Sequence, residues 1–182
     1  MENLHCDQNP CHKKGFHCVQ GMVPFVDVTK EGPGGLQVVP DTNNDKTQEE
    51  LVERYPGVKH GKSDWLELRH NDKFIGTGKL VECKAGDLIL FDSRTIHGGK
   101  INDPSQIFKE ANMNNLVRLA MTVCMVPRNL QTNMNQEKRK NAFKSRVGLT
   151  HWPQEFNKSS FGIMAVNIDR DKIKYDWPEL TP

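Results

Sequence analysis

Short apolar runs separated by glycine- and proline-rich turns constrain the fold of this chain more than any other feature. The runs lack the 3.6-residue period of an amphipathic helix, and turn residues end each of them after a few positions. Such runs are typical of β-strands. The sequence therefore predicts strands within residues 16–28, 36–39, 79–83, 87–91, 96–101 and 116–126.

Two helices are expected among these strands. Thr47 and Glu50 have the spacing of a capping box, which predicts a short helix over 47–54 that stops at Pro56. A second helical pattern covers 133–147, with Gly148 just past its end. Many short strands with two helices predict a mainly β protein, an antiparallel sandwich or jelly roll with a few peripheral helices.

Length and charge limit the function classes. The 182 residues suffice for one domain, so we expect a single domain over residues 1–182. The net charge of +2 is too small to favour nucleic acid or an anionic membrane as partner. No run approaches the roughly 18 apolar residues of a membrane span, and the first residues lack a signal-peptide pattern. We therefore expect a cytoplasmic protein whose five cysteines are free thiols.

His5 and Asp7 place two metal-ligand side chains at positions i and i+2. In an extended chain both point to the same side, so both can reach one ion. His97 is the candidate third ligand, because it ends an apolar strand and precedes two glycines that permit close approach of backbone or ligand. Two histidines and one carboxylate form the facial triad that suits non-haem Fe(II) and leaves coordination positions open.

Arg118 is the candidate anion anchor. It opens the last predicted strand, whose alternation places it on the same face as Thr122 and Cys124. A guanidinium group binds a carboxylate with two parallel hydrogen bonds. Arg128 is the competing arginine, but it lies past Pro127, at the wrong end of the strand to face the metal.

Around these candidate site residues, the chain resembles the phytanoyl-CoA dioxygenase-like branch of the Fe(II)/2-oxoglutarate oxygenases. The resemblance implies a double-stranded β-helix (cupin-like jelly roll) that hydroxylates a small organic substrate while 2-oxoglutarate is decarboxylated to succinate. It also implies that His5, Asp7 and His97 ligate Fe(II) and that Arg118 binds the distal carboxylate of 2-oxoglutarate. The segments that carry it are 5–10, 34–40, 85–92 leading to His97, and Arg118 in its strand.

Three departures from the family pattern bear on these expectations. Asp41-Thr42-Asn43 stands where many members have Gly-Ser-His, so the first loop over the site is expected to differ. The distance from His97 to Arg118 is longer than usual, so either residues 102–115 form an inserted lid or Arg118 is misassigned. Members also carry a substantial segment before the first ligand, so we expect this chain to be a fragment or a minimal variant.

Two rival functions remain open. Cys6, Cys11, His12, His17 and Cys18 lie close together in sequence and have a loose resemblance to the ligand spacing of a structural zinc site. A noncatalytic jelly roll is the second rival, with the basic residues of the 133–147 helix contacting an acidic partner. A solvated helix face is the simpler explanation for those charges, which are Lys138, Arg139, Lys140, Lys144 and Arg146.

Overall fold

The computed structural model describes residues 3–60, 64–101, 118–145, 147 and 149–156. The chain divides into two compact units, Met1–Met125 and Val126–Pro182, and the strands that the structure describes lie in the first. That the two units belong to one domain stays a prediction.

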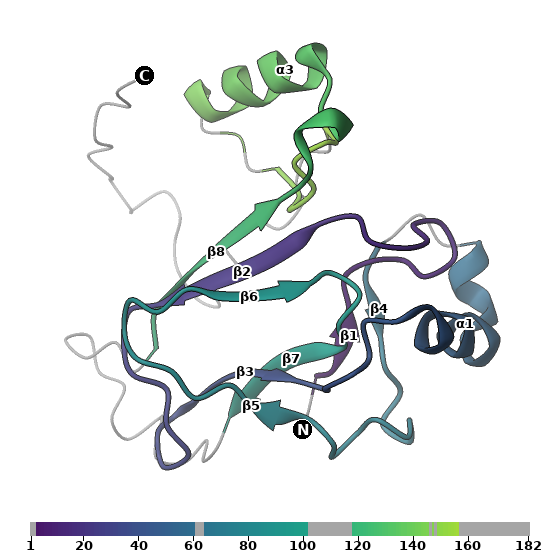
Figure 1. The fold of residues 1–182 in the computed structure, drawn as a ribbon, viewed down its shortest axis with the longest axis vertical. Coiled ribbons are helices and arrows are strands. Elements are labelled where there is room, and N and C mark those ends of the chain that lie inside the picture. Colours follow the sequence, from purple (N-terminus) through teal and green to yellow (C-terminus); the bar gives the residue numbers. More distant parts are fainter. Residues whose placement is uncertain (1–2, 61–63, 102–117, 146, 148, 157–182) are drawn as a thin grey trace, which may run out of the picture. The chain divides into compact units, whose positions relative to one another are not determined.

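One sheet of the first unit has five strands in the order β4-β1-β7-β3-β5, with every neighbouring pair antiparallel (Figure 1). The central strand β7 fixes the register, because His97 lies opposite His5 of β1 on one side and Val38 of β3 on the other. The strands are β1 (His5–Cys6), β3 (Gly34–Val38), β4 (Leu66–Glu67), β5 (Lys79–Leu80) and β7 (His97–Ile101).

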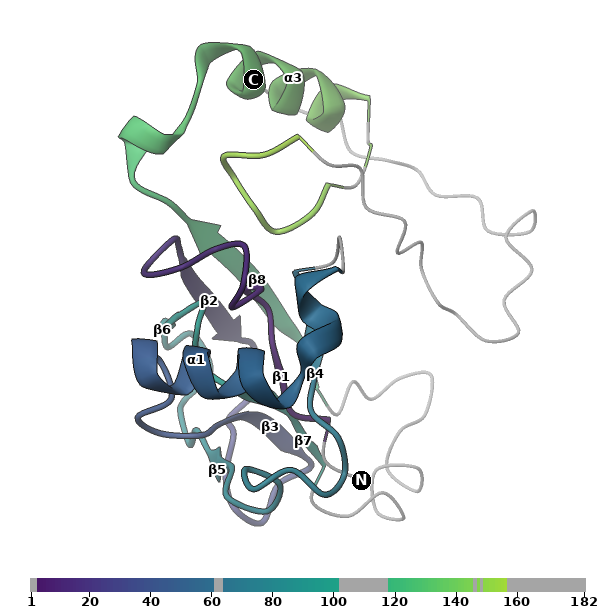
Figure 2. The same ribbon diagram turned by 90° about the vertical axis from the view of Figure 1, so that its right-hand side faces the viewer.

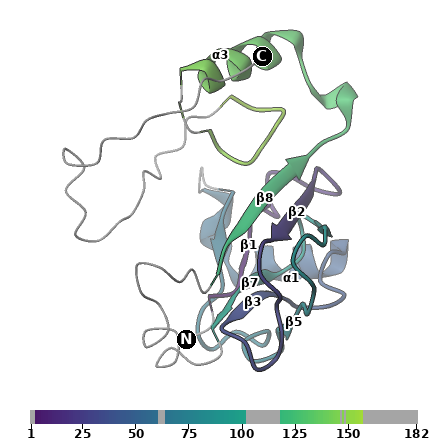
Figure 3. The same cartoon turned by 90° about the vertical axis from the view of Figure 1, so that its left-hand side faces the viewer.

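The other sheet has three antiparallel strands in the order β6-β2-β8. These are β2 (Val19–Pro24), β6 (Ile89–Asp92) and β8 (Ala120–Met125), and Figure 3 shows β2 and β8 running side by side. Gln20 of β2 lies opposite both Phe91 of β6 and Cys124 of β8. Residues opposite each other share a face, so these three side chains lie on one side of the sheet.

Two antiparallel sheets and few helices confirm the prediction of a mainly β, jelly-roll fold. Within the described residues the α-helices are α1 (Asp45–Arg54) and α3 (Asn133–Lys144), with short 3₁₀ helices η1 (Pro56–Lys59) and η2 (Arg128–Leu130). None of the described helices has the length and apolar character needed to cross a membrane.

The predicted capping box of the first helix is wrong. The helix begins at Asp45, and the side chain of Asn44 caps it by accepting a 2.9 Å hydrogen bond from the backbone N–H of Thr47. Asn44 lies three residues before Thr47, and asparagine is among the strongest N-cap residues, so it takes the place that the Thr47 pattern indicated. The predicted stop at Pro56 is confirmed, because η1 begins there.

The remaining elements are confirmed in place but differ in length. β3 begins two residues early, because Gly34 and Gly35 join the strand instead of the turn. Gly34 has φ +113°, and a Cβ there would lie 1.9 Å from the carbonyl oxygen of Lys100, so only glycine fits this position. The second predicted helix ends at Lys144, and Gly148 lies outside the described residues.

The hydrophobic core lies on one face of the five-stranded sheet, which we call the outer face. Helix α1 contributes Leu51, which is fully buried, to this core, and Figure 2 shows the helix in the foreground. Alternation along the strands turns the next residues the opposite way. We call that opposite side the inner face. The core cluster consists of Leu4, Cys6, Val39, Leu51, Tyr55, Leu66, Leu68 and Ile96.

Candidate metal centre

The pairing of β1 with β7 brings His5 and His97 together on the inner face. The two residues lie directly opposite each other in the register, and their ring centroids are 4.5 Å apart. Gly98 permits this pairing, because a Cβ there would lie 2.3 Å from the backbone oxygen of Asn3. The expectation that a glycine after His97 allows a close approach is therefore confirmed, and the approaching group is the backbone before His5.

Asp7 completes the group from the residue after β1. Its Oδ1 lies 3.6 Å from Nε2 of His5 and its Oδ2 lies 3.5 Å from Nε2 of His97. One ligand atom from each of the three residues lies within 4.8 Å of the others. Cys6 points into the core instead, as the alternation of an extended chain predicts.

Backbone carbonyls orient both imidazoles. Nδ1 of His5 is 3.1 Å from the carbonyl oxygen of Asn3, and Nδ1 of His97 is 2.9 Å from that of Thr95. A carbonyl oxygen only accepts hydrogen bonds, so Nδ1 donates in both rings and Nε2 of each neutral ring keeps its lone pair. This is the arrangement that a divalent metal ion requires of histidine ligands.

The electrostatics of the group favour the ligand-competent protonation states. Burial alone would raise the pKa of Asp7, but the neighbouring imidazoles of His97 and His5 and a hydrogen bond from Gln20 outweigh it and hold that pKa well below its usual value. Burial, followed by the charge of His97, lowers the pKa of His5. Asp7 is therefore a carboxylate and His5 a neutral imidazole at neutral pH, and metals bind these forms.

Residues outside the predicted set surround the three donors. Gln20 of β2 donates a 2.8 Å hydrogen bond from Nε2 to Oδ2 of Asp7. The ring of Phe91 lies 4.8 Å from that of His97, and the ring of Trp65 lies 5.8 Å from that of His5. Sequence reasoning missed all three, although Gln20 is a polar residue inside an otherwise apolar strand and could have drawn attention for that reason.

The loop after β3 supports His97 from the outer side. Thr42 is buried, and its hydroxyl donates to the carbonyl of Val39 at 2.7 Å and accepts from the N–H of Ile96 at 3.0 Å. This loop contains the Asp41-Thr42-Asn43 sequence that departs from the family pattern. Its hydrogen bonds fix the residue before His97 and leave the metal donors untouched.

Arg118 lies just before β8 and is exposed. Its Nη1 is 3.7 Å from the position that a Cβ of Gly99 would occupy. Gly99 follows His97 by two residues in β7, so both positions are on the inner face. Arg128 lies in η2 of the second unit, and the choice of Arg118 over Arg128 stays a prediction. The proposed lid, 102–115, lies outside the described residues.

The alternative zinc site is wrong. The structure describes all five of its candidate ligands, but they do not converge on one position. Among the described residues, the potential metal ligands that converge as a group of three are His5, Asp7 and His97. Cys6 is buried in the core, where its Sγ donates to the carbonyl of Gln8 and where burial raises its pKa to about 12. A thiol in that environment is protonated and is a poor metal ligand.

The basic residues of α3 make contacts within the second unit. Arg139 donates from Nη1 to the carbonyls of Trp152 and Glu155 at 3.0 and 3.1 Å. Lys140 pairs with Glu137 at 2.8 Å, and Lys138 lies over the ring of Phe156. These contacts favour a structural explanation for the basic run, of which Arg146 lies outside the described residues.

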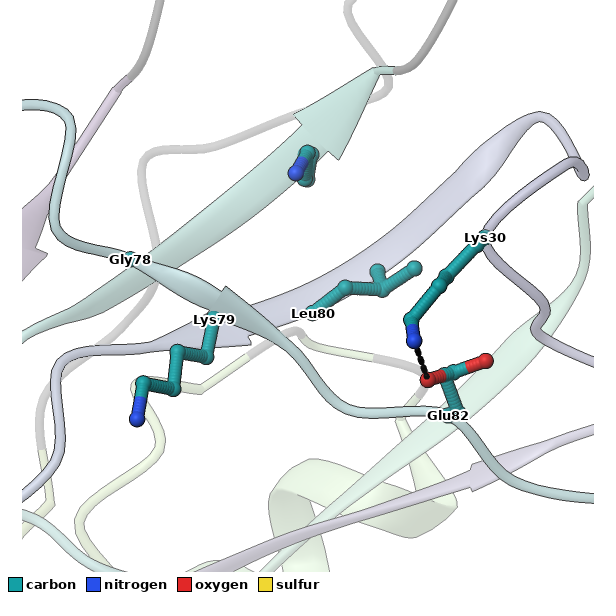
Figure 4. A pocket seen from close by; sticks show the side chains of 6 residues that line it. Lys30, Gly78, Lys79, Leu80 and Glu82 are labelled. Atoms are coloured by element: carbon teal, nitrogen blue, oxygen red, sulfur yellow. Dashed lines mark ion pairs between the residues drawn. The ribbon is translucent and has the colours of Figure 1, made fainter.

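A separate cavity of about 410 Å³ borders β5 and β7 (Figure 4). Lys30 and Glu82 on its wall form an ion pair at 3.5 Å, and Figure 4 shows Lys79 pointing away from that pair. The lining contains none of the three metal donors. It consists of Lys30, Gly78, Lys79, Leu80, Glu82 and Lys100.

Comparison with known proteins gives the family. Residues 2–109, which include all three donors, match the family model described as phytanoyl-CoA dioxygenase (PhyH). The chain belongs to the phytanoyl-CoA dioxygenase family. The part of the chain that matches the family model ends before Arg118.

A curated relative is similar to this chain over most of its length. "Ava biosynthesis cluster protein O" of Aspergillus versicolor is 30% identical over 164 residues, which cover 84% of this chain and 48% of the relative. The chain thus spans about half the length of the curated relative it matches. The recognition of the family from sequence is confirmed, and the membership supports an oxygenase-type enzyme.

Proposed function

We propose that this member of the phytanoyl-CoA dioxygenase family is an Fe(II)- and 2-oxoglutarate-dependent dioxygenase that hydroxylates a small organic substrate. The observation that carries the proposal is the convergence of His5, Asp7 and His97, with both Nδ1 atoms bound to backbone carbonyls. This donor set is the two-histidine, one-carboxylate triad that suits non-haem Fe(II).

The three residues fit a divalent ion in chemistry and in spacing. Donor atoms bound about 2.0 to 2.2 Å from one ion lie roughly 3 Å apart, and one ligand atom from each of the three residues lies within 4.8 Å of the others. Small side-chain adjustments therefore suffice for binding. When bound, Fe(II) would supply the oxidation of a substrate C–H bond, coupled to decarboxylation of 2-oxoglutarate to succinate.

The role of Gln20 is to hold the carboxylate ligand. Its amide N–H binds the Asp7 oxygen that faces His97. Such supporting hydrogen bonds fix a ligand's orientation before the metal arrives. Phe91 restrains the His97 imidazole from the β6 side by ring packing at 4.8 Å.

Arg118 is the proposed anchor for the distal carboxylate of 2-oxoglutarate. Its guanidinium group lies by Gly99, two residues along β7 from His97, which corresponds to about 7 Å of strand. This separation suits a five-carbon dicarboxylate with one end at the metal donors and the other at the arginine. The missing side chain at Gly99 leaves room for the guanidinium group.

The test measures two quantities on purified protein. Mn(II) or Co(II) affinity reports the metal site, and succinate formation with Fe(II), 2-oxoglutarate and oxygen reports the reaction. We expect His97→Ala to abolish both, while His70→Ala, which changes an exposed histidine, should leave both at wild-type level. Arg118→Ala should mainly raise the KM for 2-oxoglutarate.

The outcomes separate the proposal from its alternatives. Metal affinity that survives His97→Ala would reject the donor assignment. Metal binding that depends on His97 without succinate formation would instead favour the noncatalytic jelly roll. Since uncoupled turnover occurs without the true substrate, the assay needs no knowledge of that substrate.

A further inference from the structure

Cys18 and Cys124 meet inside the first unit. Cys18 lies just before β2 and is fully buried, whereas Cys124 lies within β8 and is partly exposed. Their Sγ atoms are 3.4 Å apart, with the Cys124 thiol donating to the Cys18 sulfur. All five cysteines of the chain are in the reduced form in the structure, including these two.

We propose that Cys18 and Cys124 are a redox modification site, at which a low-molecular-weight disulfide such as oxidised glutathione converts the two thiols into a reversible intramolecular disulfide. The sulfur atoms need to approach each other by only about 1.4 Å to reach the usual S–S bond length. Cys18 lies outside the regular part of β2, so its side chain can move without breaking the β2–β8 pairing.

The exchange takes place in two steps. The thiolate of the partly exposed Cys124 attacks oxidised glutathione, which forms a mixed disulfide and releases one glutathione thiolate. The thiolate of Cys18 then attacks Sγ of Cys124 and releases the second glutathione. The protein loses two protons and two electrons in total, and the glutathione disulfide gains them as two thiols.

The surroundings of Cys18 hold it beside Cys124. In the reduced protein, the hydrogen bond from the Cys124 thiol outweighs burial and lowers the pKa of Cys18. The Cys18 carbonyl accepts a 3.1 Å hydrogen bond from the N–H of Ser93, which holds the residue in place. Cys6 differs, because burial raises its pKa and its Sγ donates to backbone carbonyls.

The disulfide would form close to the metal donors. Cys124 lies opposite Gln20, the residue that supports Asp7, and Cys18 precedes Gln20 by two positions. The bond would therefore tie β2 to β8 next to the Gln20–Asp7 hydrogen bond. Its formation requires neither metal nor 2-oxoglutarate, so it does not depend on the proposed function.

The experiment uses the full chain without metal. Protein is equilibrated with glutathione buffers of increasing oxidised fraction, free thiols are blocked by alkylation, and peptides are mapped without reduction. We expect a peptide pair linked through Cys18 and Cys124, lighter by two hydrogens than the two free peptides, which disappears on addition of dithiothreitol. Cys124→Ser should abolish the linked pair, and the matched Cys83→Ser variant should retain it.

Several results would overturn the proposal. These are glutathione retained on Cys124 with Cys18 still free, a linkage that joins other cysteines, or a Cys18–Cys124 pair that remains reduced while Cys11 or Cys83 is modified. Thermal unfolding of the reduced Cys124→Ser protein checks that its fold is intact. If that variant does not fold, wild-type protein still decides the question, because the linked peptide is either present or absent.

Discussion

The two faces of the five-stranded sheet are built from the same strands but do different work. The outer face carries Cys6 and Ile96, which are fully buried among apolar side chains. The inner face carries their strand neighbours His5 and His97, whose side chains keep 18% and 8% exposure beside a carboxylate. Because successive residues of a strand point to opposite faces, the residues that stabilise the fold lie on one face and those that can bind a metal lie on the other.

This separation depends on register. A slip of one residue in β1 would place Cys6 opposite His97 and turn His5 into the apolar core. Contacts outside the strand ladder oppose such a slip. The side chain of buried Gln8 donates to the carbonyls of Lys13 and Gly15, and the hydroxyl of Ser93 binds its Oε1.

The largest expected effect comes from a change that disturbs both faces at once. Gly98→Ala would place a Cβ 2.3 Å from the backbone oxygen of Asn3, and neither backbone can yield without opening the β1–β7 pairing. We expect a loss of more than about 4 kcal/mol in the free energy of unfolding, together with loss of Mn(II) binding. Urea denaturation and calorimetry measure the two effects.

Gly57→Ala is the matched control, because nothing lies within 4 Å of the added methyl group. It should change the free energy of unfolding by no more than about 0.5 kcal/mol. A Gly98→Ala protein that is as stable as this control would show that β1 does not approach β7 as closely as described.

The second prediction alters the outer face alone. Leu51→Ala removes a fully buried side chain of α1 from the core cluster and should cost about 2 to 5 kcal/mol of stability. Because Leu51 is on the opposite side of the sheet from the donors, Mn(II) affinity of the folded protein should remain unchanged. Denaturant unfolding and metal titration at low temperature measure these properties.

Leu88→Ala gives the comparison, since Leu88 is 57% exposed. It should reduce the free energy of unfolding by at most about 0.5 kcal/mol. Weaker Mn(II) binding by folded Leu51→Ala protein would mean that the two faces are coupled and would contradict the separation argued above.

The third prediction alters the inner face alone. Gln20→Leu keeps a side chain of similar size but removes the hydrogen bond to Asp7. The carboxylate then loses a fixed orientation, and we expect Mn(II) affinity to fall by about 10- to 100-fold. Isothermal titration calorimetry measures the affinity, and Gln136→Leu on the exposed surface of α3 is the matched control.

Stability should respond less than affinity to the Gln20 change. An unchanged Mn(II) affinity would show that Asp7 does not need Gln20 for its orientation. A parallel collapse of stability would instead place Gln20 among the residues that hold the fold.

Local patterns explain which parts of this arrangement the sequence predicts. The His5-x-Asp7 spacing predicts that both side chains share a face, because the alternation of side chains along a strand depends on local sequence alone. His97 could be added because an apolar strand and two glycines mark its position. The three donors that the structure brings together are the three that these patterns select.

Contacts between distant segments explain what the sequence does not predict. Gln20 reaches Asp7 only because the two sheets face each other. The sequence of residues 16–28 does not indicate which face of that strand lies toward the metal donors. The alternative zinc site fails for the same reason, because cysteines that are close in sequence separate in the fold, with Cys6 in the core and Cys18 beside Cys124. The helix start was missed because Asn44 and Thr47 are both good caps, and only the backbone decides between them.

The smallest expected effect concerns a carboxylate on the core side, Asp72, whose side chain is 3% exposed. Burial alone would raise its pKa, but hydrogen bonds from Arg54, Tyr55 and the N–H of Phe74 outweigh it, so the pKa is lowered. A lowered folded-state pKa means that the stabilisation is complete above the unfolded pKa of about 4 and is lost as the pH falls through the folded value.

Asp72→Asn should therefore cost about 1 to 2 kcal/mol at pH 7 and progressively less below pH 4. Urea denaturation at several pH values measures this convergence. The Glu49→Gln variant, which changes an exposed carboxylate of α1, should parallel wild type throughout, and a constant Asp72→Asn deficit across the range would contradict the assignment.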